Sequence, residues 1–92
     1  MNEIRKKVPL TEILAGLAEE CGELVQAALK LRRVFDKTNY TPMTEEEAIE
    51  NLYEEIADVK LYMSMIDINP QYIESIQNHK LERWKERLGI NE

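Results

Sequence analysis

Two long segments of the chain carry apolar side chains at alternating steps of three and four positions, which places them on one face of an α-helix. In the first segment these residues are Leu10, Leu14, Leu17, Cys21, Leu24, Ala28, Leu31 and Phe35. In the second segment they are Ile49, Leu52, Ile56, Val59, Met63 and Ile66. No stretch shows the period of two that is typical of a β-strand. The pattern therefore predicts an all-α fold.

Capping residues set the expected boundaries of three main helices. Pro9 and Pro70 each suit the first turn of a helix, and Gly89 suits the position after a last turn. Thr44 and Glu47 have the spacing of a capping box at the start of a helix. The helices are expected over about residues 9–35, 45–66 and 70–88, after an N-terminal arm at residues 1–8 that is expected to be frayed.

A short acidic pattern, Leu-x-Glu-Glu-x-small-acid, occurs once in each of the first two expected helices. It begins at Leu17 and again at Leu52. At about 100° per residue, the second Glu and the acid three positions later lie on one flank of the apolar face in both copies. If the two apolar faces pack together, four carboxylates can converge. These are Glu20, Glu23, Glu55 and Asp58.

Carboxylates that converge and are partly shielded from water repel one another, so they need protons or a cation. Hard divalent cations with oxygen ligands suit such a cluster, and Mg²⁺ suits it best. The repeated pattern therefore predicts a Mg²⁺ site. A simpler interpretation stays open, in which the acids form solvated flanks of ordinary amphipathic helices, because Glu is a common helix former.

The third expected helix carries three cations where its apolar face would continue. Lys80, Arg83 and Arg87 lie within about 60° of one another on a helical wheel. They continue the line of Ile73 and Ile76. Arg binds phosphate through paired hydrogen bonds and Lys binds it as a point charge, so this line suggests a phosphate-binding surface. Basic residues that only complement the dipole at a helix C-terminus are the open alternative.

Length and charge restrict the class of protein. The 92 residues are expected to form one domain over residues 1–92, whose core is too small to cover three long helices, which predicts a homodimer or homotetramer. A net charge of −6 argues against nucleic-acid binding, and no apolar run is long enough to span a membrane. The single cysteine, Cys21, is expected to be buried, in a cytoplasmic protein.

The acidic and basic segments together resemble a known family. The acidic pairs are similar to the Glu-x-x-Glu … Glu-x-x-Asp signature of the MazG-like all-α nucleoside triphosphate pyrophosphohydrolases. They read Glu19-Glu20-x-x-Glu23 and Glu54-Glu55-x-x-Asp58. Residues 80–87 look like the C-terminal basic helix of that family, and the resemblance covers about residues 10–88.

The resemblance implies a reaction and a role for each group. Members of the family form dimers or tetramers and cleave a nucleoside triphosphate between the α and β phosphates, giving the monophosphate and pyrophosphate. By this resemblance the Mg²⁺ ligands would be Glu20, Glu23, Glu55 and Asp58. Lys80 and Arg83 would contact phosphate, with Arg87 as a further cation. Glu19 and Glu54 are the candidates for a general base that orients water.

Two alternatives stay open. A dUTPase-like or phosphoribosyl-ATP pyrophosphohydrolase activity belongs to the same superfamily, and nothing in the sequence selects a base. A non-catalytic helical interaction module, whose acidic flanks only keep an oligomer hydrated, belongs to a different class. Release of pyrophosphate in the presence of Mg²⁺ would separate the enzyme from the interaction module.

Overall fold

The computed structural model describes residues 2–91, and all regular secondary structure in that range is helical. The four helices are α1 (Asn2–Lys7), α2 (Leu10–Asp36), α3 (Glu45–Ser64) and α4 (Pro70–Leu88). The all-α prediction is confirmed, and the three main helices lie close to their expected positions. No helix within residues 2–91 is long and apolar enough to cross a membrane.

The short helix α1 corrects the expectation of a frayed arm at residues 1–8; residue 1 lies outside the described residues. A helix of six residues is only marginally stable alone. Here Arg5 Nη1 donates a hydrogen bond of 2.6 Å to the carbonyl oxygen of Met65, the residue that follows α3. Contact with a distant part of the chain thus stabilises α1, which local sequence signals could not indicate.

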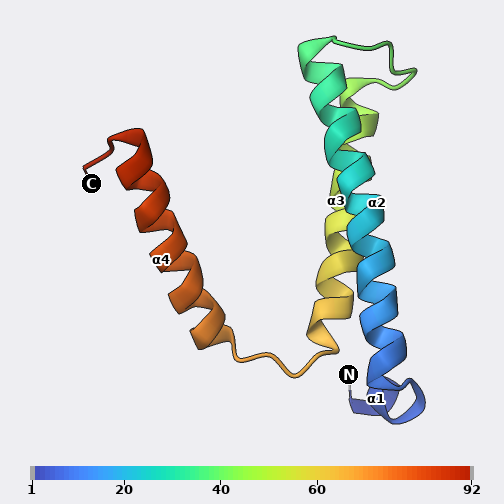
Figure 1. Ribbon diagram of the computed structural model, residues 1–92. Helices are drawn as coiled ribbons and strands as arrows, with labels where there is room; N and C mark the ends of the chain where they lie inside the picture. Colours follow the sequence, from blue (N-terminus) through green and yellow to red (C-terminus); the bar gives the residue numbers. More distant parts are fainter. Residues whose placement is uncertain (1, 92) are drawn as a thin grey trace.

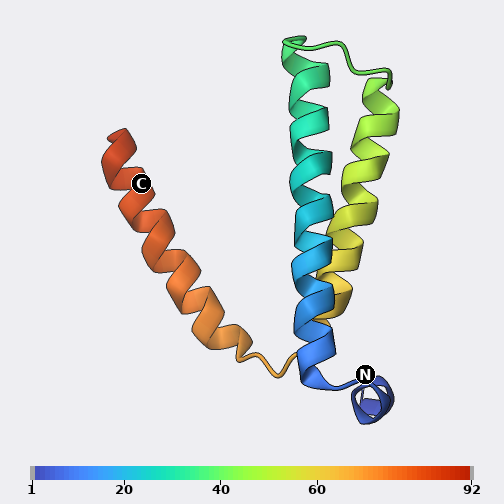
Figure 2. The same cartoon turned by 45° about the vertical axis from the view of Figure 1, so that its right-hand side comes forward.

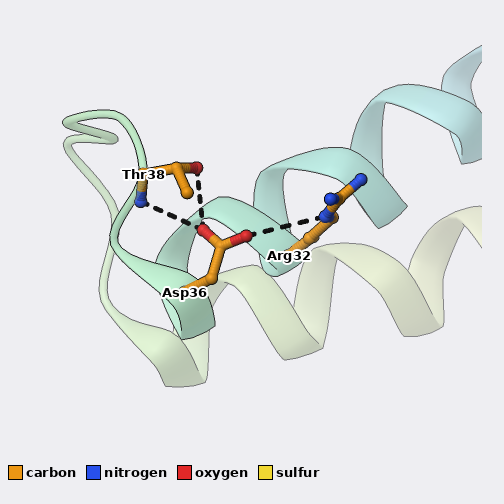
Figure 3. A network of polar contacts seen from close by, with 3 residues as sticks. All are labelled: Arg32, Asp36 and Thr38. Carbon is orange, nitrogen blue, oxygen red and sulfur yellow. Dashed lines mark hydrogen bonds and ion pairs between the residues drawn. The ribbon is translucent and has the colours of Figure 1, made fainter.

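The C-terminus of α2 is closed by a compact polar network (Figure 3). Lys37 adopts a left-handed conformation with φ 58°, and its N–H donates to the carbonyl of Arg33. Asp36 Oδ1 accepts hydrogen bonds from the Thr38 backbone N–H at 3.0 Å and from the Thr38 hydroxyl at 2.8 Å. Those bonds hold the pKa of Asp36 below its ordinary value, helped by Arg32, whose Nε lies 3.6 Å from Oδ2. The network ends the helix and turns the chain towards α3.

The start of α3 is capped as expected. The Thr44 hydroxyl accepts from the Glu47 backbone N–H at 3.1 Å, and the Glu47 carboxylate accepts from the Thr44 N–H at 2.9 Å. At the start of α4, Asn69 Oδ1 accepts from the Tyr72 N–H at 3.0 Å, and α4 ends at Gly89 with φ 72°. Side-chain hydrogen bonds at the two caps therefore set where α3 and α4 begin.

The end of α3 differs from its expected position near residue 66, because the helix stops at Ser64. The next two amides bond to carbonyls three positions back, Met65 to Tyr62 at 3.0 Å and Ile66 to Met63 at 3.2 Å. These bonds tighten the last turn and release the chain into a short connection to α4.

Helices α2 and α3 pack side by side as an antiparallel hairpin (Figures 1 and 2). The buried residues of the hairpin are Ile13, Gly16, Ala27, Ala48 and Val59. Three of the five have side chains no larger than a methyl group, so the two backbones can approach closely along this line.

The contact face is rotated away from the apolar stripe and towards the acidic flank. Leu10, Leu14 and Phe35 of the stripe are exposed, whereas Gly16 and Ala27 on the flank are buried. Cys21, which was expected to be buried, is also exposed because it belongs to the stripe that α3 leaves open. The physical reason is that the small residues lie on the flank and not on the stripe.

Helix α4 projects away from the hairpin in both views (Figures 1 and 2) and contains no buried residue. The radius of gyration is 17.1 Å, whereas a compact domain of this length would have about 12 Å. Within one chain, the packed unit is therefore the α2–α3 hairpin, with α4 as an arm.

Candidate metal centre

Three of the four predicted carboxylates meet across the hairpin. Glu20 of α2 and Glu55 and Asp58 of α3 each present one carboxylate oxygen, and these three atoms lie within 4.8 Å of one another. Glu20 and Glu55 are half-buried, and Asp58 is exposed. Because the contact face is rotated towards the acidic flank, these acids lie within the interface between α2 and α3 and not beside it.

A close approach next to the acids sets how the two helices meet. A Cβ atom placed on Gly16 would lie 2.6 Å from Tyr62 Cζ and 2.8 Å from its hydroxyl oxygen. The Tyr62 ring therefore rests directly on the backbone of α2. Gly16 precedes Glu20 by four residues and Tyr62 follows Asp58 by four, so this contact lies about 6 Å along the helix axes from the residues that carry the carboxylates.

Glu20 is destabilised as an anion in this position. Its pKa is raised above the ordinary value, mainly because the carboxyl is partly shielded from water. Repulsion from Asp58, Glu55 and Glu23 adds to the shift, in that order. A hydrogen bond between the Glu20 and Asp58 side chains raises it further, since that bond needs a proton. Glu20 therefore favours a proton or a cation.

Glu55 shows the same conflict between charge and burial. Partial burial is again the largest cause of its raised pKa, followed by repulsion from Asp58, Glu23 and Glu54. Lys30 acts in the opposite direction and lowers the pKa of Glu55, because its positive charge attracts the carboxylate. The Oε2 atom of Glu55 is buried and has no hydrogen-bond partner within the part of the chain that the structure describes. A buried acceptor without a donor is costly, and a cation would satisfy it.

The other acidic candidates lie around this group. Glu23 is exposed and outside the three closest carboxylates, but its charge raises the pKa of both Glu20 and Glu55. Glu19 and Glu54 directly precede Glu20 and Glu55 in the sequence. Both side chains are exposed, which a residue that orients a water molecule needs to be. The structure thus gathers three of the predicted ligands and leaves the fourth at the edge.

The basic candidates gather separately. Lys80, Arg83 and Arg87 line a shallow hollow of about 350 Å³ on α4, together with Trp84. Because α4 projects from the hairpin, the structure does not bring these cations to the carboxylates of the same chain (Figure 1). The three cations therefore form a surface of their own.

Sequence reasoning missed the roles of Gly16, Tyr62 and Lys30. Gly16 and Ala27 share the flank that carries Glu20, and small side chains on one flank are a signal for close helix approach. The partner of Gly16 had no comparable signal, because Tyr62 lies outside the apolar stripe of the second segment.

The geometry suits a hard divalent cation. The donor atoms are carboxylate oxygens, two of the side chains are partly withdrawn from water, and Glu55 offers an unpartnered oxygen. The exposed Asp58 leaves one side of the cluster accessible to solvent and to a ligand. The residues present therefore offer the type of donor atom that a hard divalent cation such as Mg²⁺ takes.

No family model, curated protein or solved structure matches the chain. Function is therefore inferred from the carboxylate cluster, the acidic repeats and the surfaces around them.

Proposed function

We propose that the chain is a Mg²⁺-dependent nucleotide pyrophosphohydrolase of the MazG-like type. It would cleave a nucleoside triphosphate between the α and β phosphates and release the monophosphate and pyrophosphate. The observation that carries the proposal is the meeting of Glu20, Glu55 and Asp58 across two helices, with an unpartnered buried oxygen on Glu55. Acids from two copies of one sequence pattern make up this group, which supports a binding site over a chance cluster.

The proposed roles follow from position. Glu20, Glu55 and Asp58 would hold the metal, and Glu23 at the edge would complete the ligand set. Bound Mg²⁺ would lower the pKa of a water molecule that it coordinates and would bind and orient phosphate oxygens. Glu19 or Glu54, exposed beside the ligands, would orient the attacking water as general base.

The phosphate-binding cations would come from α4. Lys80, Arg83 and Arg87 can reach the carboxylates only when α4 docks on a hairpin. Charge favours such docking, because α3 carries seven acidic residues and one Lys, whereas α4 carries four basic and three acidic residues. Docked cations would neutralise the charge that gathers on the leaving pyrophosphate.

A homodimer or homotetramer is part of the proposal. The hairpin exposes Leu14 and Ile56 on the stripe that α3 and α2 leave open. On α4, Leu81, Leu88 and Trp84 are exposed, with 61% of Trp84 accessible. Apolar surfaces of this kind on both units favour burial against another copy of the chain.

A non-catalytic helical interaction module is the second candidate, and the same exposed apolar faces favour it. Incubation with a panel of nucleoside triphosphates separates the two candidates. With Mg²⁺ the enzyme should release monophosphate and pyrophosphate, and EDTA should abolish the release. Diphosphate and orthophosphate as first products would show attack at the γ phosphorus and overturn the assignment.

A matched pair of variants ties any activity to the site. Glu55→Gln removes a proposed ligand and should be inactive. Glu50→Gln removes the same charge from an exposed position on the same helix and should keep wild-type activity. Equal activity of the two variants would contradict the proposed ligand set.

A further inference from the structure

A cavity separate from the hollow on α4 lies at the end of the hairpin next to α1, about one helical turn from the residues that carry the carboxylates. It measures about 350 Å³, within the range of pockets that bind small molecules. Its walls come from three helices, with Ile4 from α1, Gly16 from α2 and Tyr62 from α3. The hydrogen bond from Arg5 to the carbonyl of Met65 holds α1 over this end of the hairpin.

The walls have the chemistry of a site for a flat, largely apolar group. Ile4, Val8 and Met65 supply apolar surface, and Tyr62 supplies an aromatic ring. The polar groups of the lining are the phenol and two carboxylates, and no Lys or Arg is among the described residues that line it. Without a cation, the cavity does not suit a phosphate.

The two carboxylates belong to Glu12 and Glu19, which lie two helical turns apart on α2. Ionised carboxylates accept hydrogen bonds but cannot donate them. An exocyclic amino group supplies two N–H donors to these acceptors. Uracil and thymine supply a single ring N–H that lies between two carbonyl oxygens, which an ionised carboxylate repels, so a ring with an amino group is favoured.

The position of the cavity matches the order of groups in a nucleotide. Gly16 and Tyr62 of its wall are each four residues, or about 6 Å of helix rise, from Glu20 and Asp58 respectively. In a nucleotide the ribose separates the α phosphate from the base. With a phosphate at the carboxylate cluster, a nucleotide that extends towards α1 places its base at this end of the hairpin.

We propose that the cavity binds the nucleobase of the substrate and selects bases with an exocyclic amino group, such as cytosine and adenine, over uracil and thymine. This inference rests on the proposed function, since it assigns the base to the substrate whose phosphates the carboxylates would bind. Tyr62 contacts the ring, and Glu12 and Glu19 accept hydrogen bonds from the amino group, which leaves the general-base role to Glu54.

Cytidine and uridine are the matched probes, because they have the same size and differ at the pyrimidine edge. Binding of each nucleoside to the metal-free protein is followed by backbone NMR shifts, which need no catalysis. Cytidine should bind about five- to tenfold more tightly than uridine, which lies within the range for the net contribution of one typical hydrogen bond. Its largest shifts should fall near Gly16 and Tyr62. A cytidine with two methyl groups on its amino nitrogen should bind like uridine.

The variant Glu12→Gln tests the acceptor, since its amide can donate as well as accept. Glu12 is exposed, so the variant should fold, and it is compared with wild type by nucleoside binding alone. Its preference for cytidine over uridine should fall to about twofold or less, and Glu50→Gln should keep the wild-type preference.

Two results would overturn the inference. One is equal binding of cytidine and uridine to the wild-type protein. The other is shifts that centre elsewhere, for example on the groove between α3 and α4 that Met63, Ile66 and Ile73 line. Either result leaves the proposed function standing if pyrophosphate is released. Conversely, selective binding of cytidine by a protein that does not hydrolyse nucleoside triphosphates would contradict the proposed function but support a nucleoside-binding site.

Discussion

Glu55 places a carboxylate where one oxygen is buried and has no hydrogen-bond donor among residues 2–91. Without metal, the ionised side chain raises the free energy of the folded state. Glu55→Gln removes the charge, keeps the shape and adds two donors that the neighbouring carboxylates can accept. The metal-free variant should therefore melt at a higher temperature than metal-free wild type.

Mg²⁺ should reverse that order. A ligand that binds only the folded state stabilises it by about 2.7 kcal/mol at a hundredfold excess over Kd. Wild type should gain this stability, while Glu55→Gln, which lacks a ligand, should gain much less. Melting curves with EDTA and with Mg²⁺ check both steps, and Glu50→Gln should behave as wild type. If Glu55→Gln gains as much from Mg²⁺ as wild type does, the carboxylates are not the metal site.

The pH dependence of stability follows from the same two acids. In the unfolded chain Glu20 and Glu55 titrate at ordinary pKa values, and in the folded chain their pKa values are raised. Between these values the folded state binds more protons, so its stability increases as the pH falls from neutral towards that window. Thermal unfolding in EDTA between about pH 5 and pH 8 should show this increase.

Two other acids limit the gain at lower pH. Hydrogen bonds to Thr38 and Thr44 lower the pKa values of Asp36 and Glu47, so the stability they contribute is lost as the pH falls through those lowered values. Glu55→Gln should flatten the increase between neutral and mildly acidic pH and leave the loss at lower pH unchanged. A melting temperature that falls steadily as the pH is lowered from neutral would contradict the raised pKa values of Glu20 and Glu55.

The identity of the clustered acids could be predicted from sequence, because helical period fixes the angular position of each side chain. Glu20, Glu55 and Asp58 share one register relative to their apolar stripes, and the structure brings them together. Which flank of each helix becomes the interface could not be predicted. That choice depends on how closely two backbones approach at Gly16, and hence on a tyrosine from the other helix.

At the scale of elements, capping chemistry gave the starts of α3 and α4, because those ends depend on side chains next to them in sequence. The helix α1 depends instead on one contact between distant residues, Arg5 and Met65. Local patterns carry no information about such a contact. The same limit explains the wrong expectation for Cys21, whose burial depends on which face of α2 is covered.

The basic line of α4 leads to a prediction for catalysis. Arg83→Ala removes one charged contact to the leaving group and should lower kcat/KM by about 10²–10³. Mg²⁺ binding should be unchanged, because α4 supplies none of the carboxylates. Steady-state kinetics and metal titration on the same preparation check both parts.

Lys85→Ala is the matched control for Arg83→Ala. It removes one positive charge from the same helix, but Lys85 lies outside the basic line and contacts Glu82 at 3.5 Å. This variant should keep most of its activity. An equal loss of kcat/KM in both variants would mean that only the net charge of α4 matters. An unchanged kcat/KM in Arg83→Ala would mean that these cations only complement the dipole at the helix C-terminus.

At the scale of the whole molecule, the extended shape predicts association. A chain with a radius of gyration of 17.1 Å leaves apolar surface on the hairpin and on α4 exposed. Light scattering at micromolar concentration should give the mass of a dimer or tetramer, and small-angle scattering should show a particle more compact per chain. A clean monomer mass would refute the association.

The hydrogen bond between Arg5 and Met65 also has a consequence for the order of folding. It joins residues 60 positions apart, and closing so long a loop from the unfolded chain costs more entropy than forming the adjacent hairpin. Once α2 and α3 have paired, however, the end of α3 already lies near the start of α2, and only a short segment remains to dock. We therefore expect α1 to fold last and to open first, by local unfolding that leaves the hairpin intact. Local opening of the six residues of α1 would admit and release a base at the cavity without exposing the core. Amide hydrogen exchange should then be faster in α1 than in α2.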